Sequence, residues 1–186
     1  GITYVGEQDG RCFVIFNPKD VQVLDVKRFK LNEYFQNYGI LYHGTDASFD
    51  NFNKDYQNGG YLGKGFYFTM NKSMAKSYGN NIIQAKLNYK NSFFFNVDTL
   101  SNNMIIEMLD TTQAQNYQKE RILNLYHSLV NDNGFYDANS KLFDFVDTFN
   151  GDSTLILQKY GYDSIDNIDR DSEFVVFEPE QIQIIF

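Results

Sequence analysis

Three short segments of the chain carry side chains suited to catalysis or ligand binding. LYHGT at 41–45 contains His43, GKGFYFTMNKSMAKSYG at 63–79 contains Tyr67 and Tyr78, and SEFVVFEPEQI at 172–182 contains Glu173. A fixed carboxylate can stabilise positive charge that develops on a sugar carbon, and tyrosine rings can stack on a flat aromatic group. Each segment alone is a weak signal, but the three in this order and spacing form a specific pattern.

Strands and one short helix are expected to position these side chains. Residues 39–43 and 65–69 are apolar runs typical of buried strands, and residues 173–177 are a run of β-branched and aromatic residues that Glu173 opens. Asn71 is a favourable N-cap, so a helix is expected over 71–78, with Tyr78 on it.

The two glycines before the second of these strands, Gly63 and Gly65, have two interpretations. Glycine permits a positive φ or a close backbone approach beside a ligand. An ordinary turn before a strand explains both residues equally well, and the two interpretations are compatible.

The remaining periodicities indicate an α+β domain. Further strands are expected at 82–89 and 92–97, and from about residue 100 to 159 apolar residues recur at helical spacing. A loop with Asn131, Asn133 and Gly134 divides this helical half, and Gly161 ends its last helix. Strand-rich ends around a helical insert do not show the regular strand-helix alternation of a doubly wound parallel sheet.

Together the three segments resemble the His-Tyr-Glu group of ADP-ribosyltransferases, which includes the diphtheria-toxin-like and poly(ADP-ribose)-polymerase-like enzymes. Within that group they are more similar to the domains of phage and mobile-element polyvalent proteins. The resemblance covers roughly residues 39 to 186. It implies an ADP-ribosyltransferase-like fold, with a split mixed β-sheet core and a helical insert, and it implies NAD as the substrate with no metal.

The same resemblance implies catalytic roles for Glu173, His43 and Tyr67. Glu173 would accept a hydrogen bond from the 2′-hydroxyl of the nicotinamide ribose and stabilise the oxocarbenium-like transition state. Tyr67 and Tyr78 would flank the nicotinamide ring. With 14 Tyr in the chain, simple packing is the alternative for each tyrosine.

NAD-binding roles are implied for the residues around His43. His43 would hydrogen-bond a ribose hydroxyl, the Gly44 backbone would hold the carboxamide, Thr45 would support the turn and Gly65 would line the ligand. Asp171 lies two residues before Glu173, where the related Arg-Ser-Glu group has a second acid that engages an arginine acceptor. The arginine and Ser-Thr-Ser features of that group are absent here, which weakens an acceptor-side role for Asp171.

An internal repeat raises the question of whether the N-terminal residues belong to the same domain as the rest of the chain. CFVIFNPKDVQVL at 12–24 aligns without gaps with EFVVFEPEQIQII at 173–185, and Cys12 stands where the second copy has Glu173. Either two similar hairpins belong to one fold, or residues 1–28 are the tail of a preceding related module. We therefore expect an N-terminal hairpin at 1–28 and the ADP-ribosyltransferase domain at 29–186.

Composition excludes several classes of protein. The net charge of −8 gives no broad basic surface, so nucleic acid is a disfavoured partner. The single Cys excludes an internal disulfide and a thiolate metal cluster, and with only two His a zinc site is also poorly supplied. No apolar run approaches a membrane span, so no membrane partner is expected.

The resemblance therefore implies an NAD-dependent mono-ADP-ribosyltransferase that is toxin-like or a phage or bacterial effector. A host or target-cell protein would be the acceptor, in the cytoplasm of the producing or target cell, with delivery by a phage particle or a secretion system left open. The alternatives are an NAD glycohydrolase, a transferase to nucleic acid or a small molecule, and a non-catalytic module that binds NAD or ADP-ribose.

Overall fold

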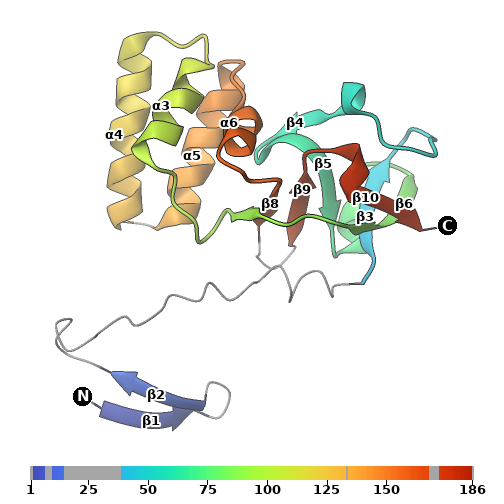
Figure 1. Cartoon of the computed structure of the whole chain (residues 1–186), viewed down its shortest axis with the longest axis horizontal. Helices are drawn as coiled ribbons and strands as arrows, with labels where there is room; N and C mark the ends of the chain where they lie inside the picture. Colours follow the sequence, from blue (N-terminus) through green and yellow to red (C-terminus); the bar gives the residue numbers. More distant parts are fainter. Residues whose placement is uncertain (1, 7–9, 15–38, 133, 168–171, 186) are drawn as a thin grey trace. The chain divides into compact units, whose positions relative to one another are not determined.

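The computed structural model describes residues 2–6, 10–14, 39–132, 134–167 and 172–185 (Figure 1). The chain divides into two compact units, Gly1–Leu31 and Asn32–Phe186. In the first unit, β1 (Ile2–Gly6) pairs with β2 (Gly10–Val14) in antiparallel fashion, with Tyr4 opposite Cys12. The rest of the first repeat copy, from residue 15 on, lies outside the described residues.

The second unit is built on a sheet whose strand order, in the described part of the chain, is β10-β6-β3-β5-β9-β8-β7, with β4 paired to β5 off this path. The parallel pairing of β7 with β8 makes the sheet mixed, since the other pairings are antiparallel. The strands are β3 (Leu41–Thr45), β4 (Asn58–Gly60), β5 (Gly63–Thr69), β6 (Asn81–Leu87), β7 (Ser92–Phe94), β8 (Ser164–Asn167), β9 (Glu173–Val176) and β10 (Ile182–Ile185).

The sheet is split between β3 and β5. β3 pairs with β6 along its whole length, from Leu41 to Thr45, but within the described residues it pairs with β5 only where Tyr42 lies opposite Thr69. Beyond this pair the two strands diverge, so the His43–Thr45 end of β3 lies at the edge of a gap in the sheet. The α+β fold with a split mixed sheet, predicted from the resemblance, is confirmed.

A helical half packs beside the β7–β8 end of this sheet, as Figure 1 shows. It buries apolar helix residues, among them Met108 and Leu142, against Phe93, Ile165 and Val175 of the sheet. The helical content predicted between residues 100 and 159 is therefore confirmed. The helices are α2 (Lys72–Lys76), α3 (Asn102–Asp110), α4 (Asn116–Asp132), α5 (Phe135–Thr148) and α6 (Ser153–Lys159), with short 3-10 turns at η2 (Lys54–Tyr56) and η3 (Pro179–Gln181).

Some predicted boundaries are wrong. The helix expected over 71–78 ends at Lys76, so Tyr78 lies in the turn that follows it rather than on the helix. The strand expected over 92–97 ends at Phe94, because the Asp98 side chain accepts a hydrogen bond from the Phe94 amide and closes a turn there. The strand expected over 82–89 is β6, which ends at Leu87.

The helical half also differs from its prediction at the division between α4 and α5. α4 continues through Asp132, which makes Asn131 helical, and Gly134, with a φ of 87°, stands at the start of α5. Gly161 ends α6 as predicted, with a φ of 88° that suits glycine.

The second copy of the repeat is not a hairpin. β9 and β10 do not pair with each other, because β5, β3 and β6 lie between them in the sheet. Gln181 stabilises the turn that separates them, since its side-chain oxygen accepts hydrogen bonds from the Phe177 and Glu178 amides. β8, which the sequence pattern does not indicate, is fully buried although three of its four residues are polar.

Candidate active site

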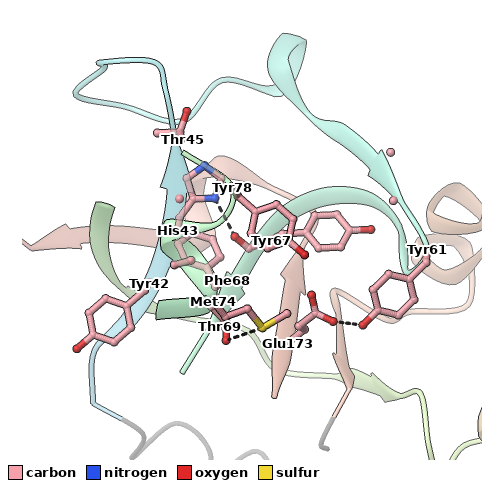
Figure 2. A pocket seen from close by; sticks show the side chains of 14 residues that line it. Tyr42, His43, Thr45, Tyr61, Tyr67, Phe68, Thr69, Met74, Tyr78 and Glu173 are labelled. Atoms are coloured by element: carbon pink, nitrogen blue, oxygen red, sulfur yellow. Dashed lines mark hydrogen bonds between the residues drawn. The ribbon is translucent and has the colours of Figure 1, made fainter. Parts of the chain in front are cut away.

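A cavity of about 400 Å³ opens at the split in the sheet (Figure 2). This volume is within the range of small-molecule sites. Six of the residues predicted for the site line it, although they come from distant parts of the sequence. The lining residues are Tyr42, His43, Gly44, Thr45, Gly59, Gly60, Tyr61, Tyr67, Phe68, Thr69, Met74, Ala75, Tyr78 and Glu173.

His43 bridges the gap between β3 and β5. Its Nδ1 lies 2.8 Å from the Tyr67 carbonyl oxygen. A carbonyl can only accept, so Nδ1 carries the proton and Nε2 of the neutral ring is an acceptor. Burial lowers the pKa of His43, an effect that the Tyr67 hydrogen bond partly opposes. The ring of His43 also contacts the rings of Phe52 and Phe68, with centroids 5.1 and 5.5 Å away.

Tyr67 is fixed at both its backbone and its side chain. Its carbonyl accepts from His43, and its hydroxyl donates to the Gly63 carbonyl oxygen at 2.6 Å. β4 lies close over the ring, since a Cβ at Gly60 would come within 2.6 Å of the Tyr67 hydroxyl. Burial raises the pKa of Tyr67, so its hydroxyl is a neutral hydrogen-bond donor.

A close contact between α2 and β3 places Tyr78 at the cavity. Asn71 caps α2 by accepting hydrogen bonds from the Ser73 and Met74 amides. The end of the helix rests on Gly44, where a Cβ would lie only 1.7 Å from the Ala75 carbonyl oxygen. The same carbonyl accepts from the Tyr78 amide, and the Tyr78 side chain remains 63% exposed.

Glu173 is held between two strands at the base of the cavity. Its side chain is 8% exposed, and its backbone lies opposite Thr69 of β5 on one side and Asn167 of β8 on the other. Burial raises the pKa of the Glu173 carboxyl group. The Tyr61 hydroxyl donates a hydrogen bond to Glu173 Oε2 (Figure 2).

Ser172, directly before Glu173, has a φ of 30°, which side-chain-bearing residues rarely adopt. Backbone strain of this kind is concentrated at functional sites in proteins.

The other predicted residues have different positions. The Thr45 hydroxyl accepts from the Ala47 amide at 3.1 Å, which stabilises the turn after β3. Gly65 lines a neighbouring cavity rather than this one. A Cβ at Gly65 would lie 2.4 Å from Val175 Cγ1, so the absence of a side chain also serves the pairing of β5 with β9. Asp171 lies outside the described residues.

The sequence of the chain matches one known protein family. The sequence model described as "ADP-Ribosyltransferase in polyvalent proteins" matches residues 38–186. The chain belongs to this family. It therefore contains an ADP-ribosyltransferase domain, from a class of enzymes that use NAD as substrate, and the resemblance predicted from the three motifs is confirmed.

Other comparisons add little to the family assignment of this ADP-ribosyltransferase domain. A search of curated proteins found no match. One similar solved structure is that of an anti-CRISPR protein, with 14% identity and a TM-score of 0.41 over 79% of this chain and 95% of that chain. A likeness this distant carries no conclusion about function.

Sequence reasoning missed two polar residues at the site of the ADP-ribosyltransferase domain. Tyr61 follows β4 and contacts Glu173, and the buried Asn167 donates from Nδ2 to the Tyr61 hydroxyl at 3.0 Å. Nothing in the local sequence distinguishes Tyr61 from the other tyrosines, and the polar segment containing Asn167 does not resemble a buried strand.

The described segments show neither a metal centre nor a membrane span. They contain no group of three or more His, Cys, Asp or Glu side chains arranged to hold a metal ion. Likewise, none of the helices in these segments is long and apolar enough to cross a membrane.

Proposed function

We propose that the domain is a mono-ADP-ribosyltransferase, which cleaves the nicotinamide-ribose bond of NAD and transfers ADP-ribose to a protein side chain. The observation that carries this proposal is the convergence of His43, Tyr67, Tyr78 and Glu173 on one cavity at the split in the sheet. In the reaction the C1′–N bond breaks, neutral nicotinamide leaves with the electron pair, and a nucleophilic atom of the acceptor bonds to C1′ and loses its proton.

Glu173 would stabilise the transition state. An ionised carboxylate fixed by two neighbouring strands can accept a hydrogen bond from the ribose 2′-hydroxyl and face the positive charge that develops near C1′. Burial strengthens this electrostatic interaction because little water competes with it. Tyr61 engages Oε2 of the carboxylate, so Oε1 would be the oxygen that accepts from the ribose.

The remaining site residues would bind NAD. The Nε2 atom of neutral His43 can accept from a ribose hydroxyl, because the Tyr67 carbonyl fixes the proton on Nδ1. The rings of Tyr67 and Tyr78 would flank the nicotinamide. Gly44 lies on the part of β3 that is not paired with β5 in the described sheet, so its backbone could hydrogen-bond the carboxamide.

A second cavity supports a ligand longer than nicotinamide ribose. It has a volume of about 830 Å³, and His43, Thr45 and Tyr67 line both cavities. Phe49 and Phe52 add aromatic surface to it. The adenosine part of NAD would therefore extend past His43 into this second cavity.

The acceptor would be a host or target-cell protein, in the cytoplasm of the producing or target cell. Membership of a family of polyvalent-protein domains supports a phage or bacterial effector that modifies one acceptor, with delivery by a phage particle or a secretion system. Asp171 would take part on the acceptor side if its carboxylate faces the same cavity as Glu173.

Incubation with labelled NAD and a bacterial lysate tests this proposal. The wild-type domain is compared with Glu173→Gln, and both labelled macromolecules and free nicotinamide are followed. Protein labelling that requires Glu173 supports the transferase, and label in nucleic acid or a small molecule instead overturns the protein acceptor. Nicotinamide release without labelling identifies an NAD glycohydrolase, and NAD binding with neither signal identifies a non-catalytic module.

A further inference from the structure

Glu173 does not stand alone in the cavity, because a chain of two hydrogen bonds reaches it from the interior of the sheet. Asn167 Nδ2 donates to the Tyr61 hydroxyl, and the Tyr61 hydroxyl donates to Glu173 Oε2. We propose that Tyr61 and Asn167 form a positioning relay that orients the Glu173 carboxylate toward the nicotinamide ribose. This inference rests on the function proposed above for the same site.

The direction of the relay follows from the chemistry of its members. An ionised carboxylate can only accept, so Tyr61 must give its single hydroxyl proton to Glu173. The Tyr61 oxygen then needs a donor, which fixes the Asn167 amide with its nitrogen toward Tyr61. In this orientation Asn167 Nδ2 lies 3.0 Å from the Tyr61 oxygen, which is a normal hydrogen-bond distance.

Each member of the relay is held by its own part of the fold. Asn167 is fully buried at the end of β8, directly opposite Glu173 in the strand register. The edge of the Tyr61 ring meets Phe95 at a centroid distance of 6.4 Å, and the next residue, Leu62, is fully buried in the helical core. The relay therefore connects the Glu173 carboxylate to the neighbouring strand β8 and, through Tyr61, to a side chain of the hydrophobic core.

The relay would serve catalysis in two ways. A glutamate side chain has several rotatable bonds, and a hydrogen bond to Oε2 restricts them so that Oε1 is left to accept from the ribose hydroxyl. A hydrogen bond donated to the charged form also favours ionisation, which opposes the effect of burial on this carboxyl group. Both effects prepare the carboxylate for the chemical step, so we expect them to change kcat more than the affinity for NAD.

Tyr61→Phe is the sharpest test, because it removes the hydroxyl and keeps the ring that contacts Phe95. We expect kcat for nicotinamide release to fall about 10- to 100-fold, the loss of one hydrogen bond to a charged group, with KM for NAD nearly unchanged. The acid limb of the kcat profile should move to higher pH. Tyr117→Phe, at a residue of α4 that is 69% exposed, is the matched control and should match the wild type.

Asn167→Ala tests whether Asn167 acts on Glu173 through Tyr61, as a relay requires, or independently of it. In the wild-type background we expect a smaller fall in kcat and a smaller shift of the acid limb in the same direction. In the Tyr61→Phe background, Asn167→Ala should add nothing to the pH shift, because its effect passes through the tyrosine hydroxyl. Additive shifts would overturn the relay, and so would an unchanged kcat and pH profile in Tyr61→Phe.

A titration that needs no activity separates this inference from the proposed function. The protein is labelled with ¹³C in the glutamate carboxyl groups, and the Glu173 signal is assigned by its loss in Glu173→Gln. Tyr61→Phe should raise the pKa of Glu173 relative to the wild type. If the wild type releases no nicotinamide, the enzyme proposal fails while this titration still decides the relay, and an unchanged pKa overturns it.

Discussion

Burial acts in opposite directions on the two ionisable residues at the centre of the site. It lowers the pKa of His43 and raises the pKa of Glu173, because the charged form of each group is disfavoured inside the protein. The effect on His43 suits its proposed role, since a neutral ring can accept from a ribose hydroxyl. The effect on Glu173 opposes its proposed role, since the carboxylate must be ionised to stabilise positive charge.

Glu173→Gln should greatly slow catalysis and stabilise the fold. We expect nicotinamide release to fall about 10²- to 10³-fold, as for the loss of other charge-stabilising groups. At neutral pH the variant should be more stable, with a rise in Tm of about 2–4 °C, because the native state no longer buries a charge.

The stability gained by Glu173→Gln should depend on pH, because only the ionised carboxylate is penalised by burial. Below the unfolded pKa of 4.5 both states of the wild type are neutral and the burial penalty is absent. The penalty grows as pH rises from there through the raised native pKa. Calorimetry should therefore show a higher Tm for Glu173→Gln than for the wild type mainly at pH 7. An equal difference in Tm at pH 4 and pH 7 would contradict a burial penalty on the ionised Glu173.

His43 should make the fold sensitive to acid. Its native pKa is lowered, so below the unfolded value of 6.5 the unfolded chain binds a proton that the native state does not, and stability is lost as pH falls. Urea unfolding at pH 7 and pH 5 should show a smaller loss in His43→Gln than in the wild type. His127→Gln, at an exposed residue of α4, serves as the control and should behave as the wild type does.

The contact of α2 with β3 is the element-level feature that shapes the cavity around Tyr78. Two glycines make it possible, because a Cβ at Gly44 would overlap the Ala75 carbonyl and a Cβ at Gly79 would lie 2.1 Å from the Thr45 carbonyl carbon. At these two glycines the backbones of helix, turn and strand therefore come into direct contact. Tyr78 depends on this fit for its position.

Gly44→Ala should destabilise the domain by about 1–3 kcal/mol, the typical cost of overpacking, because α2 must move away from β3. NAD affinity should fall with it, since Tyr78 moves too. Gly39→Ala is the matched control, because a Cβ there meets nothing within 4 Å. Chemical denaturation of both variants checks the difference, and equal stabilities would show that α2 accommodates the methyl group.

Tyr78→Ala should weaken NAD binding about 10-fold while the fold is preserved, because the side chain is 63% exposed yet lines the cavity. Titration calorimetry with NAD measures the affinity, and thermal unfolding checks the fold. Tyr117→Ala, at a comparably exposed residue of α4, should bind NAD as the wild type does. An unchanged affinity in Tyr78→Ala would remove Tyr78 from the site.

Considered whole, the molecule consists of two units that differ in their relation to the site. The unit Asn32–Phe186 contains all the residues that line the cavity, and the family match begins at residue 38. The unit Gly1–Leu31 contains Cys12 at the repeat position of Glu173, so it lacks the carboxylate on which the proposed chemistry depends. That the first unit derives from a preceding related module is a proposal, which deletion of these residues tests.

Deletion of residues 1–28 should leave the rate of NAD cleavage unchanged within about twofold and the free energy of unfolding of the second unit unchanged within about 0.5 kcal/mol, because independent units behave additively. Unfolding of the shortened chain should remain cooperative. Activity assays and calorimetry on the shortened and full chains test this. Loss of cooperative unfolding in the shortened chain would show that these residues belong to the catalytic domain.

Local patterns in the sequence determined the fold class and most of the proposed site. His43, Tyr67 and Glu173 lie in or at the ends of short apolar runs typical of buried strands, and Met104, Ile105 and Met108 recur with the period of a helix. These signals need only neighbouring residues to be recognised. The order of the three motifs then identified the family.

Only the tertiary structure decided which strands are neighbours and what surrounds the glutamate. β9 and β10 look like a hairpin locally but belong to different parts of the sheet, because strand pairing is set by long-range packing. Two side chains of the buried, polar β8 make hydrogen bonds to partners distant in sequence: Asp166 accepts from the Tyr89 hydroxyl and Asn167 donates to Tyr61. No local pattern encodes such contacts, so the Tyr61–Glu173 pair can be recognised only in the tertiary structure.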